Sequence, residues 1–527
     1  MQTLNLLYHN NKEGYNHSMN AKVGVVFAKS SRARSITQLS LMIAITMVTQ
    51  VVAMYKSSII AANFGASTEL DAYNFSNNIA SFFSIIVTSG IITVLVPAFV
   101  NKMKRSSIDS MISTVFLVTG LFLLLTFVFR GQIVDVLTDR EDEFRDCVSR
   151  TMLFSILIQM LPAMLSVTMA YYQSRDKFNL PKIILMISNL AVAVVLSVYE
   201  NFTIDGYLGI LVGGAFFQFV VDVICAVFYG FRFRITFDLT DKMFREMCRL
   251  ILPAVFGTGI YALNIMIYTM ITSNLGKGQL TVLGFANTIN VMINTLFIGN
   301  LSAYVFPQFI ITVNEGRKQG QHALWGSIVV FNAVIGLIVA GFLIVGRDFV
   351  CLLYENGKFT ADAADSVFYC MCIFIFSQQA NVISNLIYKY FSAEGDTKSS
   401  MKNSLITCIF NIIMCLIFSY FWGVYGVVSG TLFSGLISVI DNFTRLKNKY
   451  GLVISIKPYL NVLLKTQAAI LLTTVIVFLI KGLLAFSSRL VSVFLYGIIA
   501  ILLFISNMYL LNTKILKLIA KVFPTTE

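Results

Sequence analysis

Long apolar runs alternate with short polar connections along almost the whole chain. A helix needs roughly 20 apolar residues to cross a hydrocarbon core, and the pattern predicts about 14 such helices. The predicted spans are 37–63, 70–100, 108–129, 151–172, 182–200, 206–229, 250–274, 280–312, 323–346, 363–388, 403–421, 424–443, 460–481 and 488–511. Hydrophobic residues make up 57% of the chain. We therefore predict an all-α polytopic membrane protein.

Basic residues fall mostly on alternate connections between these runs. Most of the 39 Lys and Arg residues lie before the first span, in the connections that follow even-numbered spans, or in the tail. The positive-inside rule then places both termini in the cytoplasm. The net charge of +13 is carried by short clusters beside the spans, such as 102–105 and 445–449. Such clusters are typical of contact with anionic membrane lipids, so we expect no nucleic-acid partner.

An internal repeat divides the chain into two related halves. Residues 206–213 read GYLGILVG and residues 423–430 read GVYGVVSG, both inside predicted spans. The predicted units are a cytoplasmic N-terminal extension (1–36), an N-lobe of six spans (37–230), a basic linker (231–249), a C-lobe of six spans (250–447), and two further spans with a cytoplasmic tail (448–527). Because each lobe has an even number of spans, the repeat is parallel, as in some transporters, and a binding site is expected between the lobes near mid-membrane.

A lysine lies deep in the first span. Lys56 is about two thirds of the way along it, where a charge costs roughly 2.5–3.5 kcal/mol. Such a residue faces a wet cavity, or its side chain extends to the outer interface; we expect the cavity.

Polar side chains also form stripes on three spans. Each stripe has a spacing of three and then four residues, which places its members on one helix face. The stripes are Asp71, Asn74 and Asn78; Asn287, Asn290 and Asn294; and Gln378, Asn381 and Asn385. Amides both donate and accept hydrogen bonds, as a sugar requires, so we expect a hydrated cavity. The alternatives are hydrogen bonds between helices for the amides and a helix cap for Asp71.

Catalysis, metals and cofactors have little support in the sequence. All three histidines lie outside the predicted spans, and no GxxxxGK[ST] motif occurs. The eight cysteines include no CxxC pair, and most lie inside apolar spans. We therefore expect a protein that is not an enzyme and that carries no metal or cofactor.

Three short motifs resemble the MviN/MurJ-type lipid II flippase family, part of the multidrug/oligosaccharidyl-lipid/polysaccharide exporter superfamily. They are Asn63-Phe-Gly-Ala-Ser with Asp71-Ala72 after it, Val96-Pro-Ala-Phe99, and Tyr354-Glu-Asn-Gly-Lys-Phe-Thr360. The resemblance implies movement of an undecaprenyl-diphosphate-linked saccharide from the inner to the outer leaflet of a bacterial plasma membrane. It also implies a groove for the lipid tail at the last two helices.

The same resemblance assigns roles to single residues. Lys56 aligns with a cavity arginine that meets the diphosphate, and Asp71 aligns with the family aspartate. Other cavity arginines of the family align with uncharged residues here, namely Gln50, Ser84, Ile85 and Thr288. This loss of charge leaves room for another polyprenyl-linked glycan, such as a capsule or exopolysaccharide repeat unit.

We therefore expect a flippase that works by alternating access on a polyprenyl-diphosphate-linked glycan, surrounded by membrane lipids. One alternative is a cation-coupled multidrug exporter, for which Asp222 is the best carboxylate. Another is a scaffold that recruits cell-envelope synthesis enzymes without transporting. Residues 1–18 precede a compact basic leader that begins at Met19, so the sequence leaves open whether they belong to the native product.

Overall fold

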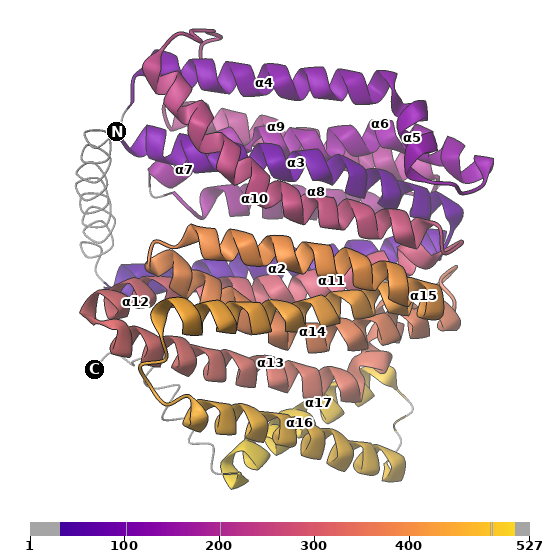
Figure 1. The fold of residues 1–527 in the computed structure, drawn as a ribbon. Helices are drawn as coiled ribbons and strands as arrows, with labels where there is room; N and C mark the ends of the chain where they lie inside the picture. The colour runs from indigo at the N-terminus through magenta and orange to yellow at the C-terminus, as the bar shows by residue number, and fades with distance from the viewer. Residues whose placement is uncertain are drawn as a thin grey trace.

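A computed structural model describes residues 32–511 apart from 102, 176, 201, 485 and 487. These residues form a bundle of helices that lie side by side (Figure 1). In chain order the helices are α2 (Arg32–Phe64), α3 (Thr68–Val100), α4 (Arg105–Val128), α5 (Arg130–Leu137), α6 (Asp142–Met164), α7 (Ser166–Ser174), α8 (Leu180–Val198), α9 (Ile204–Phe228), α10 (Lys242–Ser273), α11 (Gln279–Ile293), the π-helix η1 (Asn294–Gly299), α12 (Asn300–Glu315), α13 (Arg317–Tyr354), α14 (Ala361–Ala393), α15 (Thr397–Tyr450), α16 (Lys457–Leu483) and α17 (Arg489–Leu510). Our expectations for residues 1–18 and for most of the extension and tail lie outside the described residues.

The predicted helical membrane fold is confirmed for the described part of the chain. Thirteen helical segments there are long and apolar enough to cross a membrane. One of them, α15, is 54 residues long and contains a non-helical residue, Gly423 (φ 56°, ψ −133°). That break separates the predicted eleventh and twelfth spans, so the chain can cross fourteen times. The predicted eighth span is a single path built from α11, η1 and α12.

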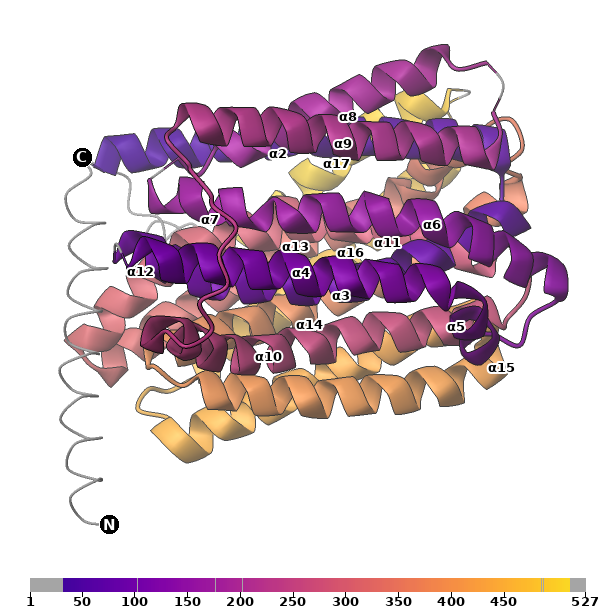
Figure 2. The same cartoon turned by 90° about the horizontal axis from the view of Figure 1, so that it is seen from above.

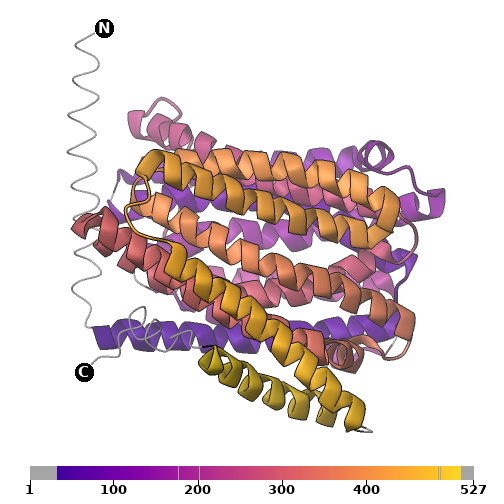
Figure 3. The ribbon, with the colours of Figure 1, turned by 60° about the horizontal axis from the view of Figure 1, so that its bottom comes forward.

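The described helices of each predicted lobe pack mainly on one another. In the N-lobe α3 packs on α6 and α7, and α8 and α9 lie together. In the C-lobe α14 packs on α13 and α15, while α16 and α17 lie against α13 at the edge of the bundle (Figure 3). We use "outer end" for the end that the charge pattern places outside, where α2 ends and α3 begins.

Helices α2 and α10 lie where the two predicted lobes meet. In the N-lobe α2 packs on α8, and it also contacts α11, η1 and α13. Although α10 was assigned to the C-lobe, it packs extensively on α3 as well as on α15. The division into two lobes stays a prediction, and these two helices form its interface.

The linker between the lobes lies along α4. Figure 2 shows it running from the end of α9 across α4 to the start of α10. The backbone N–H of Thr236 donates to Ser113 Oγ (3.1 Å), and that of Asp238 donates to Ser110 Oγ (2.9 Å). Hydrogen bonds from Ser107 and from the Met243 N–H hold the pKa of Asp241 below its usual range. The linker is therefore fastened to the N-lobe up to the first turn of α10.

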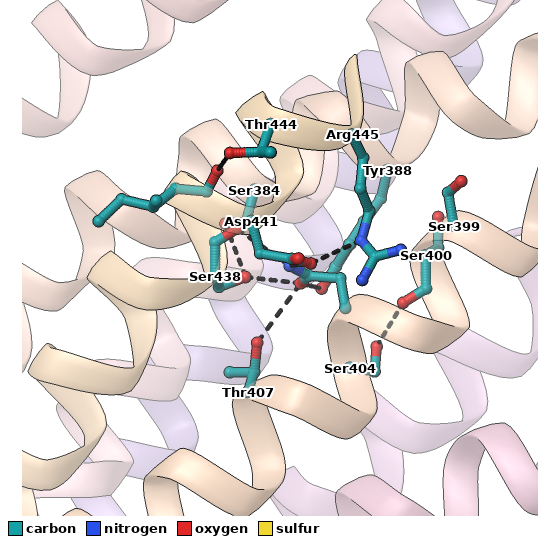
Figure 4. A network of polar contacts seen from close by, with 12 residues as sticks. Ser384, Tyr388, Ser399, Ser400, Ser404, Thr407, Ser438, Asp441, Thr444 and Arg445 are labelled. Atoms are coloured by element: carbon teal, nitrogen blue, oxygen red, sulfur yellow. Dashed lines mark hydrogen bonds and ion pairs between the residues drawn. The ribbon is translucent and has the colours of Figure 1, made fainter. Parts of the chain in front are cut away.

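A polar network joins α14 to both halves of α15 (Figure 4). Its centre is Asn403, which is fully buried. The Asn403 amide oxygen accepts from Tyr388 and from Ser438 (2.8 Å), and its Nδ2 donates to Asp441 Oδ2 (2.7 Å). Arg445 then pairs with Asp441 (2.7 Å). Because every partner belongs to the C-lobe, the network stabilises that lobe.

Candidate functional site: the interface between the lobes

The contact between α3 and α10, which we name the first seam, runs along most of the length of both helices. In its outer half Asn78 Nδ2 donates to Thr269 Oγ1 (3.0 Å). Further in, α10 approaches Gly90 so closely that an added methyl group would lie 3.4 Å from Val255 Cγ2. At the inner end, Ile91, Val94, Leu95 and Ala98 share an apolar cluster with Phe244 and Met247 of α10. The first seam is therefore closed from end to end.

Asp71 bonds the two lobes together at the outer end. Its carboxylate accepts from Arg140 Nη1 (3.0 Å), from the N–H of Gly278 (2.7 Å), and from both the N–H (2.8 Å) and the hydroxyl (2.7 Å) of Thr281. Gly278 and Thr281 are at the N-terminus of α11, where unpaired N–H groups favour an anion. The alternative role for Asp71, a cap on α3, is filled by Ser67, whose hydroxyl accepts from Leu70 N–H (3.2 Å).

This placement differs from the exposure expected for Asp71. The side chain has no exposed surface, and its hydrogen bonds are to other parts of the protein. In this conformation it fastens α3 to α11. Contact of Asp71 with a ligand stays a prediction for a conformation in which the outer end is open.

Two of the motifs that carry the family resemblance meet at the same end. Lys358 N–H, in the turn after α13, donates to the carbonyl of Ala62 near the end of α2 (2.8 Å). Gly65 and Gly357 both have a positive φ (61° and 58°), and a Cβ on either would collide with the backbone of the facing turn. Glycine is therefore required at both positions. The two motifs are far apart in the sequence, but together they close the outer end.

The second seam lies between α2 and the path of α11 and η1. By the repeat it is the counterpart of the first seam, since α2 corresponds to α10 and α11 to α3. Contact here is short and involves few residues. Val291 (47% exposed) and Asn294 are both exposed on this path. A π-helix such as η1 is often found at a functional position in a membrane or soluble protein.

Lys56 lies on α2, the helix that forms one side of the second seam. Its side chain is half-buried, and Nζ donates to Asn189 Oδ1 on α8 (2.5 Å). No ion pair reaches Lys56 in the part of the chain that the structure describes. The ammonium thus has a neutral partner and keeps two further donors.

The amide stripes of α11 and α14 face each other inside the C-lobe. Gln378 lies between Asn290 and Asn294: its Nε2 donates to Asn290 Oδ1, and its Oε1 accepts from Asn294 Nδ2 (3.5 Å). Asn385 Oδ1 accepts from Ser302 (3.0 Å). Gln378 is only 1% exposed, so these contacts match the alternative of bonds between helices.

The other amides keep more of their surface. Asn74, Asn287 and Asn381 are half-buried, and Asn294 is exposed. Asn74 faces Gly284 across the interface, where a Cβ on the glycine would lie 3.3 Å from Asn74 Nδ2. The stripes therefore mix residues that bond between helices with residues that stay accessible, and helix spacing alone does not separate them.

Several partners were not found from the sequence. Asn189 and Arg140 lie outside the stripes, and only the fold brings them to Lys56 and Asp71. Lys389 follows Asn385 at the helical spacing of four, and its ammonium lies 5.3 Å from the centre of the Phe306 ring. The spacing of four residues from Asn385 could have identified Lys389 from the sequence. No group of three or more possible metal ligands occurs among the described residues.

Sequence comparison decides the family of this fold. A sequence model of the family described as "Lipid II flippase MurJ" matches residues 60–509. The chain belongs to the MurJ family. Curated MurJ relatives named "Probable lipid II flippase MurJ" include those of Borreliella burgdorferi (22% identical, covering 80% of this chain and 85% of the relative) and Rickettsia prowazekii (20%, 73% and 79%). A third, from Synechocystis, is 23% identical over 77% of this chain and 80% of the relative.

Solved structures support the same fold. The structure "Lipid II flippase MurJ, inward closed conformation" superposes with a TM-score of 0.76 and 18% identity, covering 90% of this chain and 99% of that one. An inward-facing multidrug resistance transporter of the MATE family has a TM-score of 0.63 and 10% identity, covering 79% and 100%. The chain is therefore a multi-pass membrane protein with the fold shared by MurJ and MATE transporters.

Proposed function

We propose that this MurJ-family protein is a flippase that moves a polyprenyl-diphosphate-linked saccharide, lipid II or a related cell-envelope precursor, from the inner to the outer leaflet. The observation that carries this proposal is Lys56, an ammonium at membrane depth with a neutral partner on α8, carried by a helix that also contacts α11 and η1. A diphosphate is a stronger acceptor than an amide oxygen. The accessible amides Asn74, Asn287, Asn294 and Asn381 would then bind the sugar.

Alternating access follows from the closed outer end. Opening that end requires Asp71 to leave α11 and the Gly65 turn to leave the Gly357 turn. A ligand can favour this change only if it binds the open conformation better than the closed one. With both termini in the cytoplasm, the end closed by Asp71 faces outwards, and the ligand is loaded from the inner side.

A capsule or exopolysaccharide repeat unit is the second candidate substrate. The aligned positions Ser84 and Thr288 are uncharged, and Ser84 donates to the carbonyl of Gln159 (3.0 Å) while Thr288 donates to that of Gly284 (2.9 Å). With fewer cations, the interface offers less charge to a diphosphate and leaves more of the affinity to the sugar.

Depletion of the protein tests both candidates. The lipid-linked precursor that accumulates in the inner leaflet names the substrate, and reintroduced variants identify the residues. Lys56→Ala should abolish rescue, and Lys56→Arg should keep part of it, because a charged hydrogen bond contributes about 1.5–3 kcal/mol. Lys402→Ala is the matched control, since it removes an exposed charge from α15. Full rescue by Lys56→Ala would refute the flippase mechanism and would favour the scaffold.

A further inference from the structure

One carboxyl group inside the N-lobe lies beside no cation. Asp222, on α9, is 3% exposed. None of the ion pairs in the described part of the chain includes it. A lone carboxylate at this depth is expensive, and buried charges are normally paired.

If Asp222 were ionised, the contacts around it would need one more proton than the donors supply. Thr168 Oγ1 lies 2.7 Å from the carbonyl oxygen of Leu165 and also within hydrogen-bonding distance of Asp222 Oδ2. A hydroxyl has a single proton to donate. Both contacts are hydrogen bonds only if the proton between Thr168 and Asp222 comes from the carboxyl group.

This contact lies at a break in the helix path. Leu165 separates α6 from α7, three residues after Pro162. Proline removes a backbone donor and weakens the helix there. The Thr168 hydroxyl therefore links the break to α9 through Asp222.

The break connects to the linker between the lobes. The hydroxyl of Tyr172 donates to the carbonyl of Asp222 (2.8 Å), and that of Tyr171 donates to the carbonyl of Tyr229 (2.8 Å). The Tyr171 ring also packs against Phe231 of the linker (centroids 5.2 Å apart) and Phe99 at the end of α3 (5.5 Å). A change at Asp222 thus reaches the residues that join the lobes.

The other titratable groups near Asp222 are phenols and a thiol. They are Tyr171 and Tyr172 on α7, Cys225 on α9, and Tyr229 after it. Two described cations, Arg175 and Lys177, lie over the rings of Tyr171 (5.2 Å) and Tyr229 (5.7 Å). On α8, the apolar Leu180 packs against the cluster of Tyr171, Tyr172 and Ala226. Thiols and phenols ordinarily titrate above about pH 8, so Asp222 is the group here suited to exchange a proton nearer neutrality.

We propose that Asp222 is a proton-binding site of the N-lobe and is protonated in this conformation. The proton comes from water at the inner membrane surface and returns to it. On ionisation, the Thr168 hydroxyl must donate to the carboxylate and loses its bond to the Leu165 carbonyl, which loosens the α6–α7 break. The site depends on N-lobe geometry alone and does not require the proposed substrate.

Infrared spectra of the purified full-length protein in lipid nanodiscs test the protonation directly. We expect a protonated-carboxyl band at about pH 6, two units above the ordinary aspartate pKa of about 3.9. The band should be absent from Asp222→Asn, which preserves size and hydrogen bonding. Asp205→Asn is the matched control, because Asp205 is on the same helix, half exposed and paired with Arg150. If the wild type and Asp222→Asn have the same carboxyl band between about pH 5 and about pH 8, the proposal is wrong.

A second variant covers the case in which Asp222→Asn does not fold. Thr168→Val removes the acceptor of the carboxyl proton and preserves the shape of the side chain. The band should then remain but shift in frequency. An unshifted band would overturn the proposal, and neither result depends on whether the protein flips a glycan.

Discussion

The two seams are counterparts under the predicted internal repeat, but they differ in packing. The first seam, between α3 and α10, is continuous and ends in an apolar cluster around Ile91 and Met247. The second, between α2 and the path of α11 and η1, is short, and Asn294 is exposed beside it. Apolar side chains can pack without water, whereas the ammonium of Lys56 and the exposed amide of Asn294 require polar partners or water. The difference shows how one helical bundle can have a tightly packed side and an accessible side.

Locking the first seam gives the largest expected effect. With the eight native cysteines replaced, Asn78→Cys and Thr269→Cys should form a cross-link, because the native side chains are 3.0 Å apart. Rocking of the lobes separates these helices, so the cross-link should stop glycan flipping and a reductant should restore it. Flipping is measured as the appearance of precursor in the outer leaflet.

A cross-link inside one lobe is the control for this experiment. Ser76 and Thr151 are 2.8 Å apart on α3 and α6, both in the N-lobe. Cysteines at these positions should cross-link without stopping transport. Equal activity of both cross-linked proteins would show that the first seam does not open.

Removing the charge of Asp71 should open the outer end that both seams share. Asp71→Asn leaves Arg140 without its carboxylate and weakens the bonds to α11. Breaking a buried pair typically costs about 3–5 kcal/mol. Labelling of Ala66→Cys by a membrane-impermeant maleimide should therefore become much faster. Glu69→Gln changes an exposed residue two positions before Asp71 and should leave the labelling rate unchanged.

Gln378 distinguishes structural amides from ligand-binding ones beside the second seam. Gln378→Leu leaves Asn290 without its partner, which should lower stability by about 1–3 kcal/mol, read as a lower midpoint of thermal unfolding in detergent. Asn381→Leu, on the same helix and half-buried, should change the midpoint less and the flipping rate more. The reverse order would assign the ligand to Gln378.

Asn294→Ala has the smallest expected effect. Because Asn294 is exposed and its bond to Gln378 is long (3.5 Å), the free energy of unfolding should change by less than about 0.5 kcal/mol. Loss of one neutral hydrogen bond to sugar, about 0.5–1.5 kcal/mol, should weaken glycan binding a few-fold. Val291→Ala, on the same exposed path, is the matched control for lost side-chain volume. Equal binding by the two variants would remove Asn294 from the proposed site.

The sequence predicted much of the membrane fold. Apolar runs of spanning length and short polar connections predicted the helices, because a bilayer leaves few alternatives for unpaired backbone groups. The break at Gly423 also agrees with the predicted gap between the eleventh and twelfth spans. Helix spacing grouped the amides into stripes, since one face of a helix follows from its period alone.

The sequence by itself thus determined the helices and their polar faces, which depend on local periodicity and on the cost of polar groups in lipid. Only the tertiary structure decided the partners. It buried Asp71 against α11, placed Gln378 between Asn290 and Asn294, and brought the Gly65 turn to the Gly357 turn. Such contacts join residues far apart in the chain, and they depend on how helices rotate and pack, which no local pattern specifies.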